Sequence, residues 1–274
     1  MSRALWLLLV SLVTVAADQK DPLTRAHQLY NQHQYDEAIT AASEARRTPA
    51  LADAAAVVLA RAYLERYRNT PAPNADDLAM AREALKAVDA ANLTPRDHVE
   101  LLIGLGESLY FDDRFGAAAE MFDLALAQSG IDAATPRERV LDWWANAMDR
   151  QAQISADADR KSTYTRLLDR MDTEAKAHPD SAVAAYWVVA AARGTDDLDR
   201  AWQAAIAAWV RAPLVTPKDA AVTLRADLDR IVVDALIPER ARQLVPRGDR
   251  SQIIAALSAE WTAVKEQWKG GGVR

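Results

Sequence analysis

The side chains that could carry out chemistry are few and widely spaced. The chain has four histidines, at positions 27, 33, 98 and 178. His27 and His33 are six residues apart, about 240° around a helix, and so do not share a helical face. The sequence contains no HExxH zinc motif, no glycine-rich phosphate loop and no nucleophile elbow. We therefore expect a protein that is not an enzyme and has no catalytic residues.

Cysteine is absent, which excludes thiol nucleophiles, thiolate metal sites and disulfides. Carboxylate pairs do occur, but each lies at an expected turn or helix start, where capping and solubility explain it. A calcium loop needs oxygen ligands at more positions and a glycine at its turn. We expect no metal and no cofactor. These carboxylate clusters are Asp76–Asp77, Asp112–Asp113, Asp157/Asp159 and Asp196-Asp197-Asp199.

The segment Gly104-Leu105-Gly106 has the spacing of part of a dinucleotide-binding loop. It lies inside a helical stripe with no strand before it, so this interpretation is not adopted. A small residue at Gly106 instead allows two helices to approach closely, and Gly106→Leu is expected to be destabilising through overpacking.

The elements that must position any site are clearest over residues 102–126. Apolar residues recur at helical spacing on either side of the polar turn Asp112-Asp113-Arg114. Gly106 and Ala118 permit close contact, and Phe122 fills the space beside them. This pattern predicts an antiparallel pair of helices joined by a short turn.

The same order of small and large residues recurs along the chain. It is found upstream over residues 26–49, including the run from Tyr35 to Ile39, and downstream over residues 198–213. Ala26 and Ala60 are 34 residues apart, which is the tetratricopeptide period. The chain resembles the tetratricopeptide repeat family over residues 19–213. The resemblance implies a right-handed α-solenoid of about five helical hairpins.

Composition agrees with an all-α fold. The 274 residues are 50% hydrophobic and 26% charged and include only 9 glycines. Alanine, the strongest helix former, dominates the apolar fraction. We predict a tetratricopeptide-like solenoid over residues 18–213 and a C-terminal helical cap with a disordered tail over residues 214–274.

Several residues predict where helices begin and end. Thr94-Pro95, Thr135-Pro136 and Thr216-Pro217 share a cap threonine followed by proline at the first helical position. Asn74 is expected to cap a helix in the same way, and Gly194 is expected at a helix C-cap. The polar residues 155–160 are either a longer loop or a helix extension.

Residues 1–17 are typical of a signal peptide, with Arg3 ahead of an apolar run that ends in the small residues Ala16 and Ala17. About 14 apolar residues are too few to span a bilayer, which takes roughly 20. A buried N-terminal helix is the alternative. We expect an exported protein, periplasmic or secreted, without a stable membrane anchor after signal cleavage. The formal charge of −6 argues against nucleic-acid binding.

Seven of the eight tryptophans follow residue 142. Packing between helices is the main interpretation, and a partner groove is the alternative, because tryptophan is enriched in binding hot spots. Trp261 and Trp268 lie on the last predicted helix, where they either cap the end of the repeat array or dock a partner.

In the tetratricopeptide family, the first helix of each hairpin lines a concave ligand groove. The resemblance therefore implies a protein- or peptide-binding scaffold acting outside the cytoplasm, with no basic clamp for a carboxylate terminus and with its oligomeric state left open. The alternative is a small-molecule-binding component associated with a transporter, which needs an enclosed pocket near residues 143–209 with inward arginines. The implied groove residues are His27, Tyr30, Asn31, Arg61, Glu107, Tyr110, Phe111, Asp142 and Asn146.

Overall fold

The computed structural model describes residues 21–128, 137–216 and 218–269. Every regular element in these ranges is helical, which confirms the predicted all-α class. The expected signal peptide, the Thr135-Pro136 helix start and the glycine-rich tail lie outside these ranges. The α-helices are α1 Pro22–Asn31, α2 Tyr35–Ala45, α3 Ala52–Asn69, α4 Ala75–Lys86, α5 Pro95–Tyr110, α6 Phe115–Leu126, α7 Arg137–Ile154, α8 Asp157–Ala177, α9 Ala182–Gly194, α10 Leu198–Arg211, α11 Lys218–Ile231, α12 Ile237–Leu244 and α13 Ser251–Gln267.

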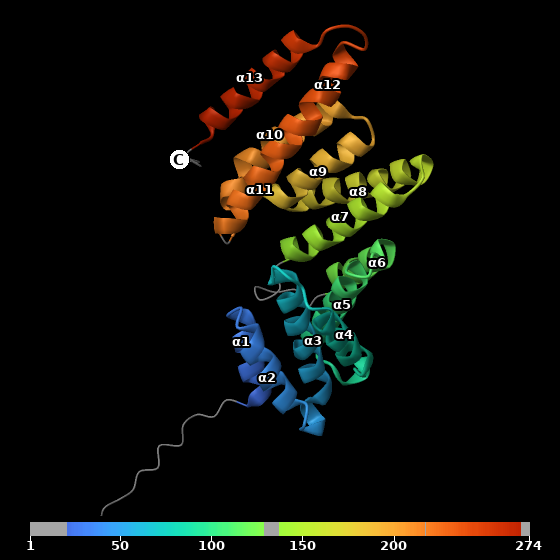
Figure 1. Ribbon diagram of the computed structural model, residues 1–274, viewed down its shortest axis with the longest axis vertical. Helices are drawn as coiled ribbons and strands as arrows, with labels where there is room; N and C mark the ends of the chain where they lie inside the picture. Colours follow the sequence, from blue (N-terminus) through green and yellow to red (C-terminus); the bar gives the residue numbers. More distant parts are fainter. Residues whose placement is uncertain (1–20, 129–136, 217, 270–274) are drawn as a thin grey trace, which may run out of the picture.

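The helices pack mainly against their neighbours in the chain, so that the molecule is built up pair by pair (Figure 1). The first pairs, α1 with α2 and α3 with α4, lie at one end of the molecule, and α12 and α13 lie at the other. First helices also meet across pairs, as α3 does with α5 and α7 does with α9. The result is a compact stack of helices.

Small residues allow this close packing. Ala26 and Ala60 are fully buried, and Gly106 faces the ring of Phe122. A Cβ atom at position 106 would lie 2.6 Å from Phe122 Cε1, too close for any side chain without displacement of the ring. The expected role of Gly106 in close helix approach is confirmed.

Three of the turns between paired helices share one geometry. His33, Asp113 and Asp196 have positive φ angles of 61°, 57° and 65°. In each turn the next residue donates its N–H to a carbonyl five positions back, as Gln34 does to Leu29 at 2.9 Å. This is the six-to-one bond of a Schellman motif, with Asp or His replacing the usual glycine. The turns follow α1, α5 and α9, the first helices of the pairs that carry the sequence repeat.

Two of the predicted caps can be examined and both are confirmed. The Thr94 hydroxyl accepts from the Asp97 N–H at 3.2 Å, and the Asn74 side chain accepts from the Asp76 N–H at 3.0 Å. Near the third threonine-proline start, α11 begins at Lys218. Residues 157–160 belong to α8, so the polar segment is mostly a helix extension.

Two local expectations were wrong. Gly194 is the last residue of α9 rather than its left-handed cap, which is Asp196. Glycine is needed at position 194 because a Cβ there would lie 2.1 Å from the Tyr164 ring. In addition, Pro71 and Pro73 predict a non-helical insertion over residues 68–73, but α3 continues through Asn69 because Pro71 is the first residue that prevents helix.

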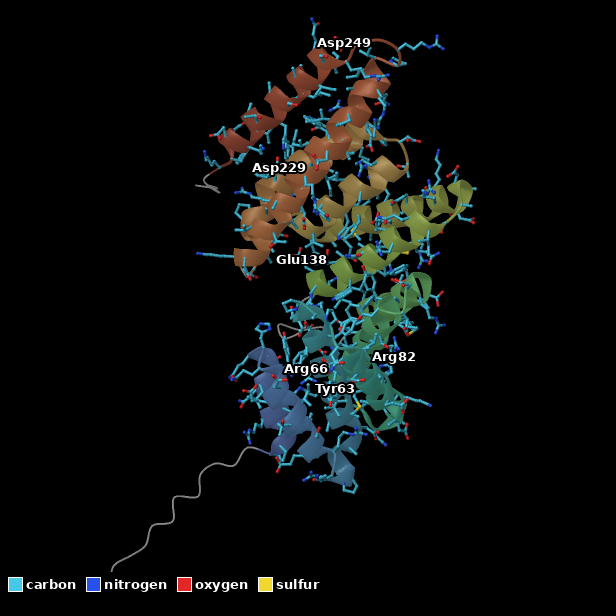
Figure 2. The ribbon with its side chains drawn as sticks, in the orientation of Figure 1. Tyr63, Arg66, Arg82, Glu138, Asp229 and Asp249 are labelled. Atoms are coloured by element: carbon cyan, nitrogen blue, oxygen red, sulfur yellow. The ribbon has the colours of Figure 1, made fainter. Side chains whose placement is uncertain are left out.

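Ion pairs join the second helices of the pairs to their neighbours. Arg66 on α3 reaches Asp77 on α4 at 2.5 Å and Asp36 on α2 at 2.6 Å (Figure 2). Arg170 on α8 reaches Asp123 on α6 at 2.6 Å. In each ion pair at least one of the two side chains is partly exposed to solvent, so the pair by itself contributes little to stability.

The C-terminal helices close the far end of the stack. A π-helical segment, Val232–Leu236, joins α11 to α12 and accommodates Pro238, which lacks the N–H of a regular helix. Trp261 of α13 is 1% exposed, packs against Trp202 and Trp209, and donates its indole N–H to Asp229 at 2.7 Å. Trp261 is therefore a packing residue of this end. None of the helices within the described ranges is both long and apolar enough to cross a membrane.

Candidate functional site

The residues implied by the family resemblance fall into two connected groups on α1, α3, α5 and α7. Tyr30, Arg61 and Glu107 form a polar group, and Tyr110, Phe111 and Asn146 form an aromatic one. The remaining three residues lie at the edges. His27 Nε2 is 4.0 Å from Asp97, Asn31 is exposed at the end of α1, and Asp142 is exposed on α7 and accepts from the Trp187 indole at 2.8 Å.

Arg61 is the centre of the polar group. Its guanidinium pairs with Glu107 on α5 and donates to Glu100 at 3.1 Å. It also lies 5.8 Å from the centroid of the Tyr30 ring. Arg61 and Glu107 are 3% and 1% exposed. They are therefore buried, and the expectation that they line an open surface was wrong.

Glu65, one helical turn after Arg61 on α3, extends the group. It is 2% exposed, accepts from Arg68 at 2.6 Å, and pairs with Arg139 of α7. Burial alone would raise the pKa of Glu65, but the charges of Arg139, Arg61 and Arg68 hold that pKa below its usual range. Glu65 is thus a carboxylate kept ionised by the surrounding arginines.

The pKa of Glu107 is shifted in the opposite direction. Burial raises its pKa, and the nearby Glu65 charge adds to this effect, while Arg61 and Arg139 oppose it only in part. The pKa of Tyr30 is also raised by burial. The group therefore combines one carboxylate whose pKa is lowered with a carboxylate and a phenol whose pKa values are raised.

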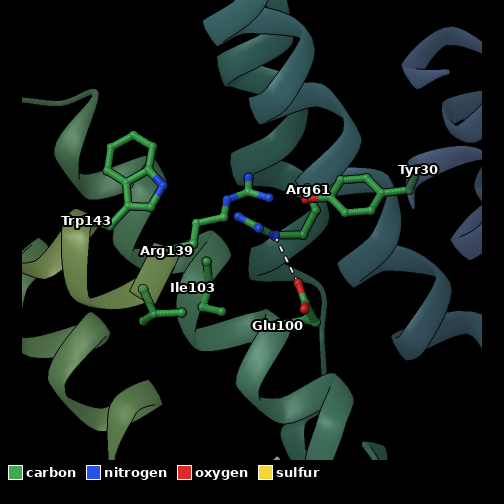
Figure 3. Close-up of a pocket in the computed structure, with 7 residues that line it drawn as sticks. Tyr30, Arg61, Glu100, Ile103, Arg139 and Trp143 are labelled. Carbon is green, nitrogen blue, oxygen red and sulfur yellow. Dashed lines mark hydrogen bonds and ion pairs between the residues drawn. The ribbon is translucent and has the colours of Figure 1, made fainter. Parts of the chain in front are cut away.

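Some hydrogen-bonding capacity in this group is unused. Within the described part of the chain, the Tyr30 hydroxyl and Glu107 Oε1 are buried without a hydrogen-bond partner. A cavity of about 10 Å³, which is roughly the space needed by one water molecule, is lined by Tyr30. Figure 3 shows the side chains of Arg61, Arg139 and Tyr30 pointing toward this space. Its lining residues are Tyr30, Arg61, Glu100, Ile103, Arg139, Val140 and Trp143.

The aromatic group continues from the edge of this cavity. The ring centroid of Trp143 is 5.1 Å from that of Tyr110 and 6.0 Å from that of Phe111. Phe111 also packs edge-on against Tyr67 at 5.0 Å, and the Tyr110 hydroxyl donates to Asn146 at 2.8 Å. All but Asn146 present a ring, and all five are partly exposed. A partly exposed cluster of rings is suited to recognising another molecule by packing.

Sequence reasoning missed four members of the site: Glu65, Arg68, Glu100 and Arg139. A usable signal was present for Glu65, because it is four residues from Arg61 and must share its face. Glu100 is likewise seven residues from Glu107. Arg139 gave no such signal, because its partner Glu65 is 74 residues away on another helix.

The site consists of paired charges and partly exposed rings. In the described ranges, no three or more His, Asp or Glu side chains are arranged to hold a metal ion. The charged side chains pair with one another, and the aromatic side chains form the exposed part. No protein-family model and no curated protein matches this chain.

Proposed function

We propose that this protein is a non-enzymatic scaffold that binds a protein or peptide partner along the first helices of its hairpins. In this proposal the helices form a right-handed tetratricopeptide-type solenoid of about five hairpins, closed by α11 to α13. The contacts between consecutive pairs, the buried positions of Ala26, Ala60 and Gly106, and the repeated turn geometry support this arrangement.

The observation that carries the functional proposal is the gathering of aromatic and amide side chains from α5 and α7. Tyr110, Phe111 and Trp143 are in mutual ring contact, Asn146 is hydrogen-bonded to Tyr110, and all four remain partly exposed. Rings held by their neighbours lose little freedom on binding, which favours affinity. A rigid surface of this kind fits a peptide or protein segment with apolar side chains.

The location of this function is also a proposal. The apolar run over residues 1–17 supports export, with the mature chain acting in the periplasm or outside the cell. N-terminal sequencing of the protein recovered from cells tests this. A mature end near residue 18 is expected, and a chain that retains residues 1–17 would contradict it.

The alternative, a small-molecule component of a transporter, is less well supported. Inward arginines are present, but Arg61 and Arg139 lie between α1, α3, α5 and α7 rather than within residues 143–209. Their cavity of about 10 Å³ is far smaller than the roughly 300 Å³ of a typical ligand pocket.

Site-specific photo-cross-linking tests the scaffold role. A photoreactive residue is placed at Asn31 or Asp142, which are exposed on first helices, and at Glu120 or Asp169, which are exposed on second helices. The proposal predicts that one and the same partner is captured from both first-helix positions and from neither control. Capture that is equal at all four positions, or absent from both first-helix positions, contradicts it.

A further inference from the structure

Two contacts on the first-helix face join α3 directly to α7 and so pass over the intervening hairpin. Arg139 of α7 pairs with Glu65 of α3, and the guanidinium of Arg68 on α3 lies 5.8 Å from the centroid of the Trp143 ring on α7. Helix α5 comes between α3 and α7 in the chain and packs against both. The two contacts therefore reach across α5 from its neighbours on either side.

The side chains of α5 beneath these contacts are buried. Ile103 is 2% exposed and Glu107 is 1% exposed. By contrast, the side chains of Arg139 and Arg68 are 36% and 42% exposed. The crossing side chains thus lie nearer the solvent than the α5 side chains, and Figure 3 shows Arg139 and Trp143 beside Ile103 at the cavity.

The two crossing arginines are held by an ion pair and a cation–π contact, whereas Trp143 is also fixed by ring contacts with Tyr110, Phe111 and Phe122. Glu65 retains Arg68 as a partner if Arg139 leaves, so separation does not strand its charge. Arg61 likewise keeps Glu100 and Glu107. The hydrophobic core is divided here as well, because Leu101 of α5 packs in a cluster with α1 to α4 while Leu102 and Ile103 pack in a second cluster with α6 to α13. Opening at this point leaves both clusters intact.

We propose that the side chains of Arg68 and Arg139 form a strap that closes over α5 and opens to expose the cavity lining at Ile103. When open, the strap makes the Tyr30 hydroxyl, which lines the cavity and lacks a hydrogen-bond partner in the described structure, available for hydrogen bonding. This proposal rests on the proposed partner-binding function only for its biological role. The opening itself is a property of the chain and needs no partner.

The absence of cysteine allows a direct test. The variant Ile103→Cys carries a single thiol in the cavity lining, and its rate of reaction with a small maleimide reports how often the strap opens. We expect slow reaction in the otherwise native chain. Adding Arg139→Met should accelerate the reaction by about tenfold or more, because local opening then becomes more frequent. Adding Arg68→Met instead should also accelerate the reaction, because it removes the second contact of the strap.

Two controls separate opening from unfolding. The variant Val189→Cys places its thiol in the core of α9, at a position that is fully buried, and reports global unfolding in each background. The variant Arg200→Met breaks a comparable ion pair, that of Arg200 on α10 with Asp172 on α8. It should leave the rate at position 103 unchanged.

The outcomes are distinct. Faster labelling at position 103 with Arg139→Met or Arg68→Met, and not with Arg200→Met, supports the strap. Equal acceleration at positions 103 and 189, or no acceleration with either strap variant, overturns it. Because no partner is used, a negative result leaves the cross-linking test of the scaffold role unaffected.

Discussion

The two ends of the molecule bury polar groups in different ways. Between α1, α3, α5 and α7, whole charges are buried, including Arg61, Glu65 and Glu107. Toward the C-terminus, burial is mostly of large rings, and individual indole N–H groups reach surface carboxylates, as Trp202 does to Glu260 at 2.9 Å and Trp261 does to Asp229 at 2.7 Å.

The difference indicates a division of roles. A buried ion pair is weak evidence for stability, because desolvation offsets most of its attraction. A buried tryptophan, by contrast, removes a large apolar area from water. We infer that the tryptophan-rich end supports the fold, while the charged group at the other end positions the helices that carry the proposed binding surface.

The largest effect is expected when a buried charge loses its partner. Arg61→Met leaves Glu107 without its cation and should lower the free energy of unfolding by about 3–5 kcal/mol. Urea denaturation near neutral pH measures this. The double variant Arg61→Met/Glu107→Met should regain much of the loss. A single variant as stable as the native chain would show that the charges are not coupled.

Overpacking at the closest helix contact is next in size. Gly106→Leu should destabilise by about 2–4 kcal/mol, because the new side chain must displace the Phe122 ring. Gly116→Ala is a matched control, since a Cβ there meets only the flexible end of Gln151 at 3.2 Å. Phe122→Ala in the Gly106→Leu background should restore part of the stability. An unchanged melting temperature for Gly106→Leu would contradict the assigned hairpin.

A helix cap should have a smaller effect. Thr94→Ala removes the side-chain acceptor for the Asp97 N–H and should cost about 1 kcal/mol. Thr94→Ser keeps the hydroxyl and is the control. Thermal unfolding of the two variants gives the comparison, and equal loss in both would mean that the methyl group rather than the cap matters.

The smallest effect concerns pH. Burial raises the pKa of Glu107, so the folded chain holds this proton more tightly than the unfolded chain. Its contribution to stability is complete below the unfolded pKa and is lost as pH rises through the folded pKa. Glu107→Gln keeps the neutral form and should flatten the decline in unfolding free energy as pH rises above the unfolded glutamate pKa of about 4.3. Denaturant titrations above that pH measure the slope, and an unchanged slope would exclude Glu107 as its source.

Local patterns predicted the fold where the information lies within one hairpin. The stripe around Gly106, the Thr94 cap and the Asn74 cap all depend on residues close in sequence, and the structure confirms them. Gly194 was misassigned because its constraint, the Tyr164 ring, comes from the preceding hairpin.

The candidate site was less predictable for the same reason. The sequence marks which positions of α1, α3, α5 and α7 share a face, and Tyr110 and Asn146 do meet as that reading suggests. It cannot show that Arg139 crosses to Glu65 and leaves Glu107 buried rather than open. That contact depends on how tightly three successive hairpins are stacked.

The central claim is that the first-helix face recognises the partner and the tryptophan-rich end supports it. The most direct measurement is the affinity of the cross-linked partner for Phe111→Ala and for Trp268→Ala, two partly exposed aromatic positions at opposite ends. We predict that Phe111→Ala weakens binding by about tenfold or more, as expected for a hot-spot ring, while Trp268→Ala leaves it nearly unchanged. Loss of affinity with Trp268→Ala alone would place the partner on the last helix and contradict this account.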